Sequence, residues 1–80
     1  MADLFDTAKP VTNQQRVAAA LTDGMSRDLR FVAEVSGLDA KQAHTALHGL
    51  HANNRVMRMA DGYWAITPRG TRWLEEVSRG

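Results

Sequence analysis

Residues 32–55, VAEVSGLDAKQAHTALHGLHANNR, decide the fold of this chain. The first part has apolar residues at helical spacing and ends at Gly37, because glycine tolerates the left-handed backbone that closes a helix. Asp39 follows as a helix N-cap, and Gln42 stands three residues later, where its side chain can reach back to the cap in a capping box. The stretch therefore predicts two helices joined by a tight turn, a helix-turn-helix.

The second helix of this pair, predicted over residues 40–52, has one apolar face and one polar face. Its apolar residues recur with the 3.6-residue period and should face the core: Ala43, Ala46, Leu47 and Leu50. At 100° per residue the opposite side collects hydrogen-bond donors: Lys41, His44, Thr45 and His48. No carboxylate lies among them, so this face suits an anionic partner such as nucleic acid. Asn53 and Asn54 should end the helix, since asparagine tolerates the left-handed conformation.

Residues 55–67 predict a β-hairpin around Asp61-Gly62, a pair typical of two-residue hairpin loops. A two-residue loop predicts two cross-strand pairs on the face that packs against the core: Met59 with Trp64, and Met57 with Ile66. The other face would then carry Arg58, Ala60, Tyr63 and Ala65. A basic and an aromatic side chain near the tip are what a DNA-contacting wing presents.

Capping residues mark two further helices and the start of the first helix of the helix-turn-helix. Thr12, with Gln15 three residues later, predicts a helix over about residues 13–22. Asp28 or Ser26 should cap the first helix of the helix-turn-helix, whose inward side chains would be Leu29, Val32, Ala33 and Val35. Thr67-Pro68 predicts the start of a last helix over about residues 68–78, with one face formed by Gly70, Trp73, Leu74 and Val77.

Residues 32–39, the helix after them and residues 61–70 (DGYWAITPRG) together resemble winged helix-turn-helix DNA-binding domains, of the MarR-like type found in small bacterial transcription regulators. The resemblance covers about residues 13–77. It implies an α+β fold: a small winged helix-turn-helix with a three-helix core, a β-hairpin wing and a short C-terminal helix. It also implies a one-bridge strand at residues 25–27 and insertion of helix 40–52 into the DNA major groove.

The length of 80 residues fits one small domain. We expect residues 1–11, which contain Pro10, to form a flexible arm, and residues 12–80 to form the domain. Leu4 and Phe5 in the arm would either pack onto the domain or onto a second copy, or belong to a frayed tail. The absence of cysteine excludes a disulfide framework or thiolate metal site, so the expected compartment is the cytoplasm. No apolar stretch approaches the roughly 20 residues that span a bilayer, and no membrane association is expected.

Charge is unevenly distributed along the chain, although its net value is only +1. Residues 1–40 carry four basic and six acidic side chains, whereas residues 41–80 carry six basic and three acidic ones. The basic half contains the predicted reading helix and wing, which favours nucleic acid as the partner. The excess is small for a monomer that must hold DNA by neutralising phosphates, so it favours a homodimer or a protein partner.

The predicted DNA-binding residues are Lys41, Gln42, His44, Thr45 and His48 on the helix, with Arg58 and Tyr63 on the wing. Lysine can donate to guanine or phosphate, glutamine can make a paired contact with adenine, and threonine can contact any base. Histidine can donate to phosphate when it is protonated. The competing interpretation of the same residues is an ordinary solvated helix face.

Three histidines, His44, His48 and His51, stand on one side of helix 40–52. Neighbouring pairs could share a metal such as zinc, but the outer two are about 10 Å apart along the helix axis, so one ion could not reach all three. Two imidazoles without a cysteine or carboxylate make a poor closed site, and we expect no metal or cofactor. No catalytic triad, carboxylate pair or phosphate-binding glycine loop is visible, so we do not expect an enzyme.

These patterns predict a small transcription regulator that binds double-stranded DNA sequence-specifically, as a homodimer. The alternative belongs to a different class of function. It is a winged-helix module that binds a protein, such as a phage- or plasmid-type inhibitor or adaptor acting on a larger protein or nucleoprotein complex.

Overall fold

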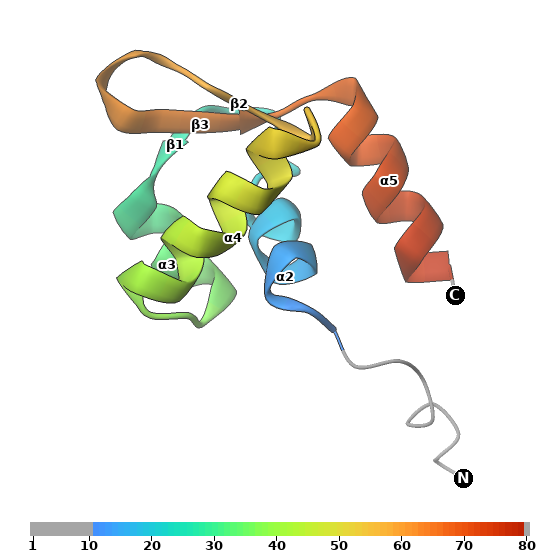
Figure 1. Ribbon diagram of the computed structural model, residues 1–80, viewed down its shortest axis with the longest axis horizontal. Helices are drawn as coiled ribbons and strands as arrows, with labels where there is room; N and C mark the ends of the chain where they lie inside the picture. Colours follow the sequence, from blue (N-terminus) through green and yellow to red (C-terminus); the bar gives the residue numbers. More distant parts are fainter. Residues whose placement is uncertain (1–10, 80) are drawn as a thin grey trace, which may run out of the picture.

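The computed structural model describes residues 11–79, which form helices on one side of a small sheet (Figure 1). The helices are α2 (Asn13–Ala20), α3 (Leu29–Ser36), α4 (Ala40–Ala52) and α5 (Pro68–Arg79), and the strands are β1 (Arg27–Asp28), β2 (Val56–Arg58) and β3 (Tyr63–Ile66). The sheet has the order β1-β3-β2, and both strand pairs are antiparallel. This arrangement confirms the predicted α+β winged helix-turn-helix. The short strand that joins the wing is present at Arg27–Asp28, although it was expected at residues 25–27.

The predicted arm, with Leu4 and Phe5, lies outside the described residues except for Val11. Among the residues that are described, none of the helices combines the length and apolar character needed to cross a membrane.

The predicted helix boundaries are set by local capping contacts, as expected. α3 ends at Gly37, which adopts a left-handed conformation with φ 77°. The Asp39 side chain accepts from the Gln42 backbone N–H at 2.7 Å, and the Gln42 side chain accepts from the Asp39 N–H at 3.2 Å, which completes the capping box of α4. A second capping box joins Thr12 and Gln15 at the start of α2. Asp28, rather than Ser26, caps α3.

The core is built where α2, α3 and α4 meet the sheet. Its largest fully buried side chains are Leu21, Leu47, Leu50, Val17, Val32 and Val56. The predicted inward face of α4 is confirmed, because Ala43, Ala46, Leu47 and Leu50 are all buried. Val35 was predicted to face inward but is 57% exposed. Ser36 of α3 is buried instead, and its hydroxyl is satisfied because it donates a hydrogen bond to the Ala33 carbonyl oxygen at 3.2 Å.

The hairpin differs from its prediction by one residue of register. β2 pairs with β3 so that Val56 lies opposite Ile66 and Arg58 lies opposite Trp64. The loop has three residues, Ala60–Gly62, and the Met59 N–H donates to the Tyr63 carbonyl oxygen at 2.6 Å across its base. The predicted pairs of Met59 with Trp64 and Met57 with Ile66 are therefore wrong. Asp61 and Gly62 both have a left-handed backbone, and Ala60 joins them in the loop.

This shift moves side chains to opposite faces of the wing, because alternate residues of a strand point to opposite sides. Met57 and Met59 were predicted in the core but are 43% and 41% exposed, whereas Val56 and Trp64 are buried. Arg58 shares the face of Trp64, with its guanidinium carbon 5.7 Å from the ring centroid. The predicted grouping of Arg58 with Tyr63 on one face is thus also corrected.

The register makes a direct prediction for two adjacent residues. Val56→Ala should lower the free energy of unfolding by about 2 kcal/mol, since it removes two buried methyl groups and leaves a cavity. Met57→Ala should change it by less than about 0.5 kcal/mol, because that side chain is exposed. Urea denaturation followed by circular dichroism measures both values. A larger loss for Met57→Ala than for Val56→Ala would contradict the register.

The last helix is fastened to the segment between α4 and β2. The Thr67 hydroxyl donates to the Asn54 carbonyl oxygen at 2.7 Å and accepts from the Gly70 N–H at 3.0 Å, so it joins the two segments and caps α5. Gly70 is buried, and a Cβ at this position would overlap the Arg55 carbonyl oxygen. The Arg55 guanidinium carbon lies 4.5 Å from the centre of the Trp73 ring. These contacts hold α5 beside the helix-turn-helix.

Candidate nucleic-acid interface

The outward face of α4 carries five of the residues that the sequence predicts to contact DNA. In Figure 1, α4 crosses the middle of the molecule between α3 and the hairpin of β2 and β3. Because its buried stripe faces the core, the residues opposite that stripe point away from the protein. All five residues predicted on this helix are exposed: Lys41, Gln42, His44, Thr45 and His48. No acidic side chain lies within α4.

Gln42 has a second role that limits what it can recognise. Its side-chain oxygen accepts from the Asp39 N–H in the capping box, which leaves the amide NH₂ as its free group. A paired contact with adenine uses the oxygen as well as the NH₂ of the side chain. While the cap is intact, the Gln42 side chain therefore offers the two N–H donors of its NH₂, and its oxygen is already engaged.

Trp64 connects the face of α4 to the wing. We call the group formed by Trp64, His48, His51 and Arg58 the Trp64 cluster. The imidazoles of His48 and His51 approach the indole edge-on, with ring centroids 6.2 Å and 6.0 Å away. Arg58 approaches the same indole from β2. Histidine and arginine donors from two elements thus gather around one buried ring.

Sequence reasoning did not assign His51 to this interface. Its spacing of three residues from His48 was a usable signal, because residues three apart are neighbours on a helix surface. The wing register was also needed, since it places Trp64 beneath both rings.

Tyr63 is exposed on the opposite face of the wing from Arg58. Met57 and Met59 are exposed near it, so this face is mainly apolar. The structure therefore does not bring Tyr63 together with the helix residues. Its position near the loop Ala60–Gly62 still allows it to contact a partner that reaches the tip of the wing.

Not every cation of the described chain is available to a partner. Arg27 forms an ion pair with Asp23 at 2.6 Å and lies over the Phe31 ring. The pKa of the Asp23 carboxyl is lowered, first by the backbone N–H of Met25 and then by the Arg27 guanidinium. Lys41 on α4 and Arg58 on the wing are the two permanent cations near the outward face of α4 that the sequence predicted. The outward face of α4 therefore offers a partner neutral hydrogen-bond donors as well as these two cations.

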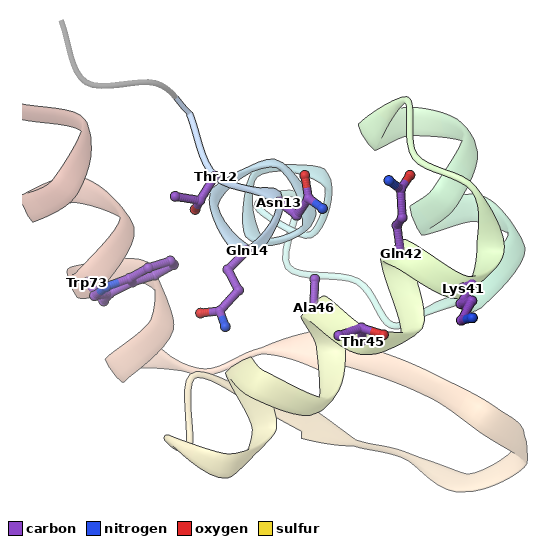
Figure 2. Close-up of a pocket in the computed structure, with 8 residues that line it drawn as sticks. All are labelled: Thr12, Asn13, Gln14, Lys41, Gln42, Thr45, Ala46 and Trp73. Carbon is purple, nitrogen blue, oxygen red and sulfur yellow. The ribbon is translucent and has the colours of Figure 1, made fainter.

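A groove of about 670 Å³ lies on the flank of this surface (Figure 2). Figure 2 shows Trp73 of α5 on one side, Gln14 of α2 in the middle and Ala46 and Thr45 of α4 beyond it. The other lining residues are Thr12, Asn13, Lys41 and Gln42. Lys41, Gln42 and Thr45 therefore border both the groove and the outward face. Within residues 11–79, no group of three or more histidine, cysteine or acidic side chains is arranged to hold a metal ion.

Solved structures with the same fold include a MarR family transcriptional regulator. The MarR family transcriptional regulator SPO1453 from Silicibacter pomeroyi DSS-3 is similar over 84% of this chain and 50% of its own chain, with a TM-score of 0.73 and 21% sequence identity. BpsR from Bordetella bronchiseptica, whose DNA binding is regulated by 6-hydroxynicotinic acid, is similar over 85% and 53%, with a TM-score of 0.78 and 22% identity. RV1404 from Mycobacterium tuberculosis is similar over 98% and 56%, with a TM-score of 0.74 and 17% identity.

These similarities confirm the winged-helix fold of MarR-type regulators that the sequence predicted. The chain spans about half the length of these proteins. No protein-family profile and no curated protein matches the sequence.

Proposed function

We propose that this chain is a DNA-binding module of a transcription regulator, in which α4 enters the major groove and the wing contacts the flanking backbone or minor groove. One observation carries the proposal. The side of α4 opposite its buried stripe presents Lys41, Thr45 and His48 to solvent, without an acidic residue on the helix. The major groove, about 12 Å wide, admits an α-helix with such donors on its outer side.

The contacts of this module follow from the chemistry of the side chains. Thr45 and the Gln42 NH₂ are suited to base edges, since both are short, neutral and near the start of the helix. Lys41 and Arg58 are suited to phosphates, which position the protein without reading sequence. The Trp64 cluster fixes the wing relative to α4, so Arg58 and His48 meet the duplex as one unit.

The fold neighbours support this function. The description of SPO1453 as a MarR family transcriptional regulator, and that of BpsR as a protein whose DNA binding is regulated, agree with a winged helix used on DNA. The proposal for this chain therefore has two supports, the side chains on its own α4 surface and the fold that it shares with these proteins.

We also propose that the module acts as a homodimer. A single copy offers two permanent cations near the outward face of α4, Lys41 and Arg58, and non-specific affinity rises with the number of phosphates neutralised. Two copies would double that number and place two reading helices in successive major grooves, about 34 Å apart.

Fluorescence polarisation with a mixed-sequence duplex tests the proposal. If a dimer neutralises about four phosphates, the logarithm of affinity should fall with the logarithm of salt concentration with a slope of about −3.6, or roughly 150-fold between about 50 and 200 mM salt. An equimolar single-stranded oligonucleotide is the control and should bind more weakly. Absence of binding at low salt, or an affinity that does not depend on salt, would contradict the proposal.

A further inference from the structure

Two histidines of α4 hold their outer ring nitrogens close together. His44 and His48 are one helical turn apart, and both side chains are exposed. The distance between His44 Nε2 and His48 Nε2 is 3.2 Å. The rings meet edge-on, with centroids 4.4 Å apart and planes inclined by 67°.

This spacing matches the geometry of a metal chelate. Zinc binds an imidazole nitrogen at about 2.0–2.1 Å, so two such nitrogens stand about 3.4 Å apart at a tetrahedral ion. At a right angle, as in octahedral or square-planar coordination, they stand about 2.9 Å apart. The observed distance lies between these two values. From this match we propose that His44 and His48 form an open, two-imidazole site for a divalent transition metal ion that prefers nitrogen ligands, such as Ni²⁺, Cu²⁺ or Zn²⁺.

The protein holds these ligands in place before the ion arrives. The backbone of α4 fixes the spacing of positions 44 and 48, because the apolar stripe of this helix is buried in the core. The His48 imidazole also rests against Trp64, which is only 4% exposed. An ion that binds both nitrogens therefore needs little reorganisation of the chain, which favours binding.

The ion competes with a contact that the two rings can make with each other. Without a metal, one neutral ring can donate from Nε2 to the Nε2 of the other across the 3.2 Å separation. For chelation both neutral rings carry their proton on Nδ1, so that each Nε2 presents a lone pair to the ion. This change is a shift of tautomer in one ring, and water fills the remaining coordination positions.

The proposed site differs from the closed structural site that the sequence argued against. A closed site uses about four protein ligands and contributes to folding, whereas this one has two ligands on an exposed helix face. His51 is the matched comparison, since it lies on the same helix and packs against the same indole as His48. It is seven residues from His44, about 10 Å along the axis, and is too far away to share an ion with it.

Isothermal titration of untagged protein with Ni²⁺, in a non-coordinating buffer, tests the assignment. We expect one Ni²⁺ per chain, and affinity reduced by more than about tenfold, equivalent to ~1.4 kcal/mol, in His44→Ala and in His48→Ala. His51→Ala should bind as the unchanged protein does. Because all three side chains are exposed, circular dichroism should show the same fold in each variant. Equal binding by all variants, or a loss in His51→Ala as large as in the other two, would overturn the proposal.

A second readout locates the ion near Trp64. In a Trp73→Phe background Trp64 is the remaining tryptophan, and it lies against His48. Bound Cu²⁺ should quench its fluorescence, and adding His48→Ala should restore it. Quenching that persists after His48→Ala would place the ion elsewhere. Neither titration contains DNA, so failure of the metal site and failure of the proposed function are distinguishable.

Discussion

Lys41→Glu should lower the affinity for duplex DNA by more than about tenfold, because it puts a carboxylate where α4 would meet the phosphates. Like charges brought together at an interface cost several kcal/mol, and the lost lysine also removes one released counterion per copy. The slope of affinity against salt should therefore become shallower by about 0.9 for each copy bound. Lys41 is exposed at the start of α4, so the thermal unfolding temperature should stay nearly unchanged.

Arg79→Glu is the matched control for this change. It alters the net charge by the same amount, but Arg79 is the last residue of α5, at the end of that helix that lies away from the hairpin (Figure 1). We expect its DNA affinity to stay within about twofold of the unchanged protein, since exposed charges more than a Debye length apart are largely screened. Equal losses in both variants would mean that net charge, and not the face of α4, governs binding.

Trp64→Ala should destabilise the domain by about 3–5 kcal/mol, the usual cost of removing a large buried aromatic side chain. For a chain of this size that is a large part of the total stability, so much of the protein should be unfolded at 37 °C. The same change removes the support of His48, His51 and Arg58. Thermal melting followed by circular dichroism measures the effect.

Trp73→Ala provides the comparison for Trp64→Ala. Trp73 is a half-buried residue of α5 that lines the groove, and the Arg55 guanidinium lies over its ring. Because it loses less buried area, we expect a smaller cost. If Trp73→Ala were the more destabilising of the two, Trp64 would not be the link between wing and helix that the structure indicates.

The parts of the fold that depend on local contacts could be predicted from the sequence. Asp39 with Gln42, Thr12 with Gln15 and the left-handed Gly37 each mark a helix end within a few residues. The side of α4 that faces the core was also predictable, since a helix with a fixed angle per residue leaves little freedom once its apolar positions are known.

The hairpin register could not be predicted in the same way. Asp61-Gly62 is compatible with a two-residue or a three-residue loop, and Ala60 gives no signal that decides between them. The three-residue loop places Val56 in the core and leaves Met57 exposed, although both are apolar. One additional loop residue thus exchanges the core-facing and the outward-facing side chains of β2 relative to the prediction.

The candidate site was predictable only as far as it lies on one helix. The exposure of Lys41, Thr45 and His48 followed from periodicity. The Trp64 cluster did not, because it depends on the register of the wing. The distance between His44 Nε2 and His48 Nε2 depends on side-chain rotamers, which the sequence does not specify.

Chemical-shift mapping by nuclear magnetic resonance tests most directly whether DNA meets the outward face of α4. Titrating duplex DNA into ¹⁵N-labelled protein should shift the amides of residues 41–48 and of the wing around Arg58 most strongly. The second half of α5, from Glu75 to Arg79, should change little. Shifts concentrated on α5 with residues 41–48 unaffected would contradict the account.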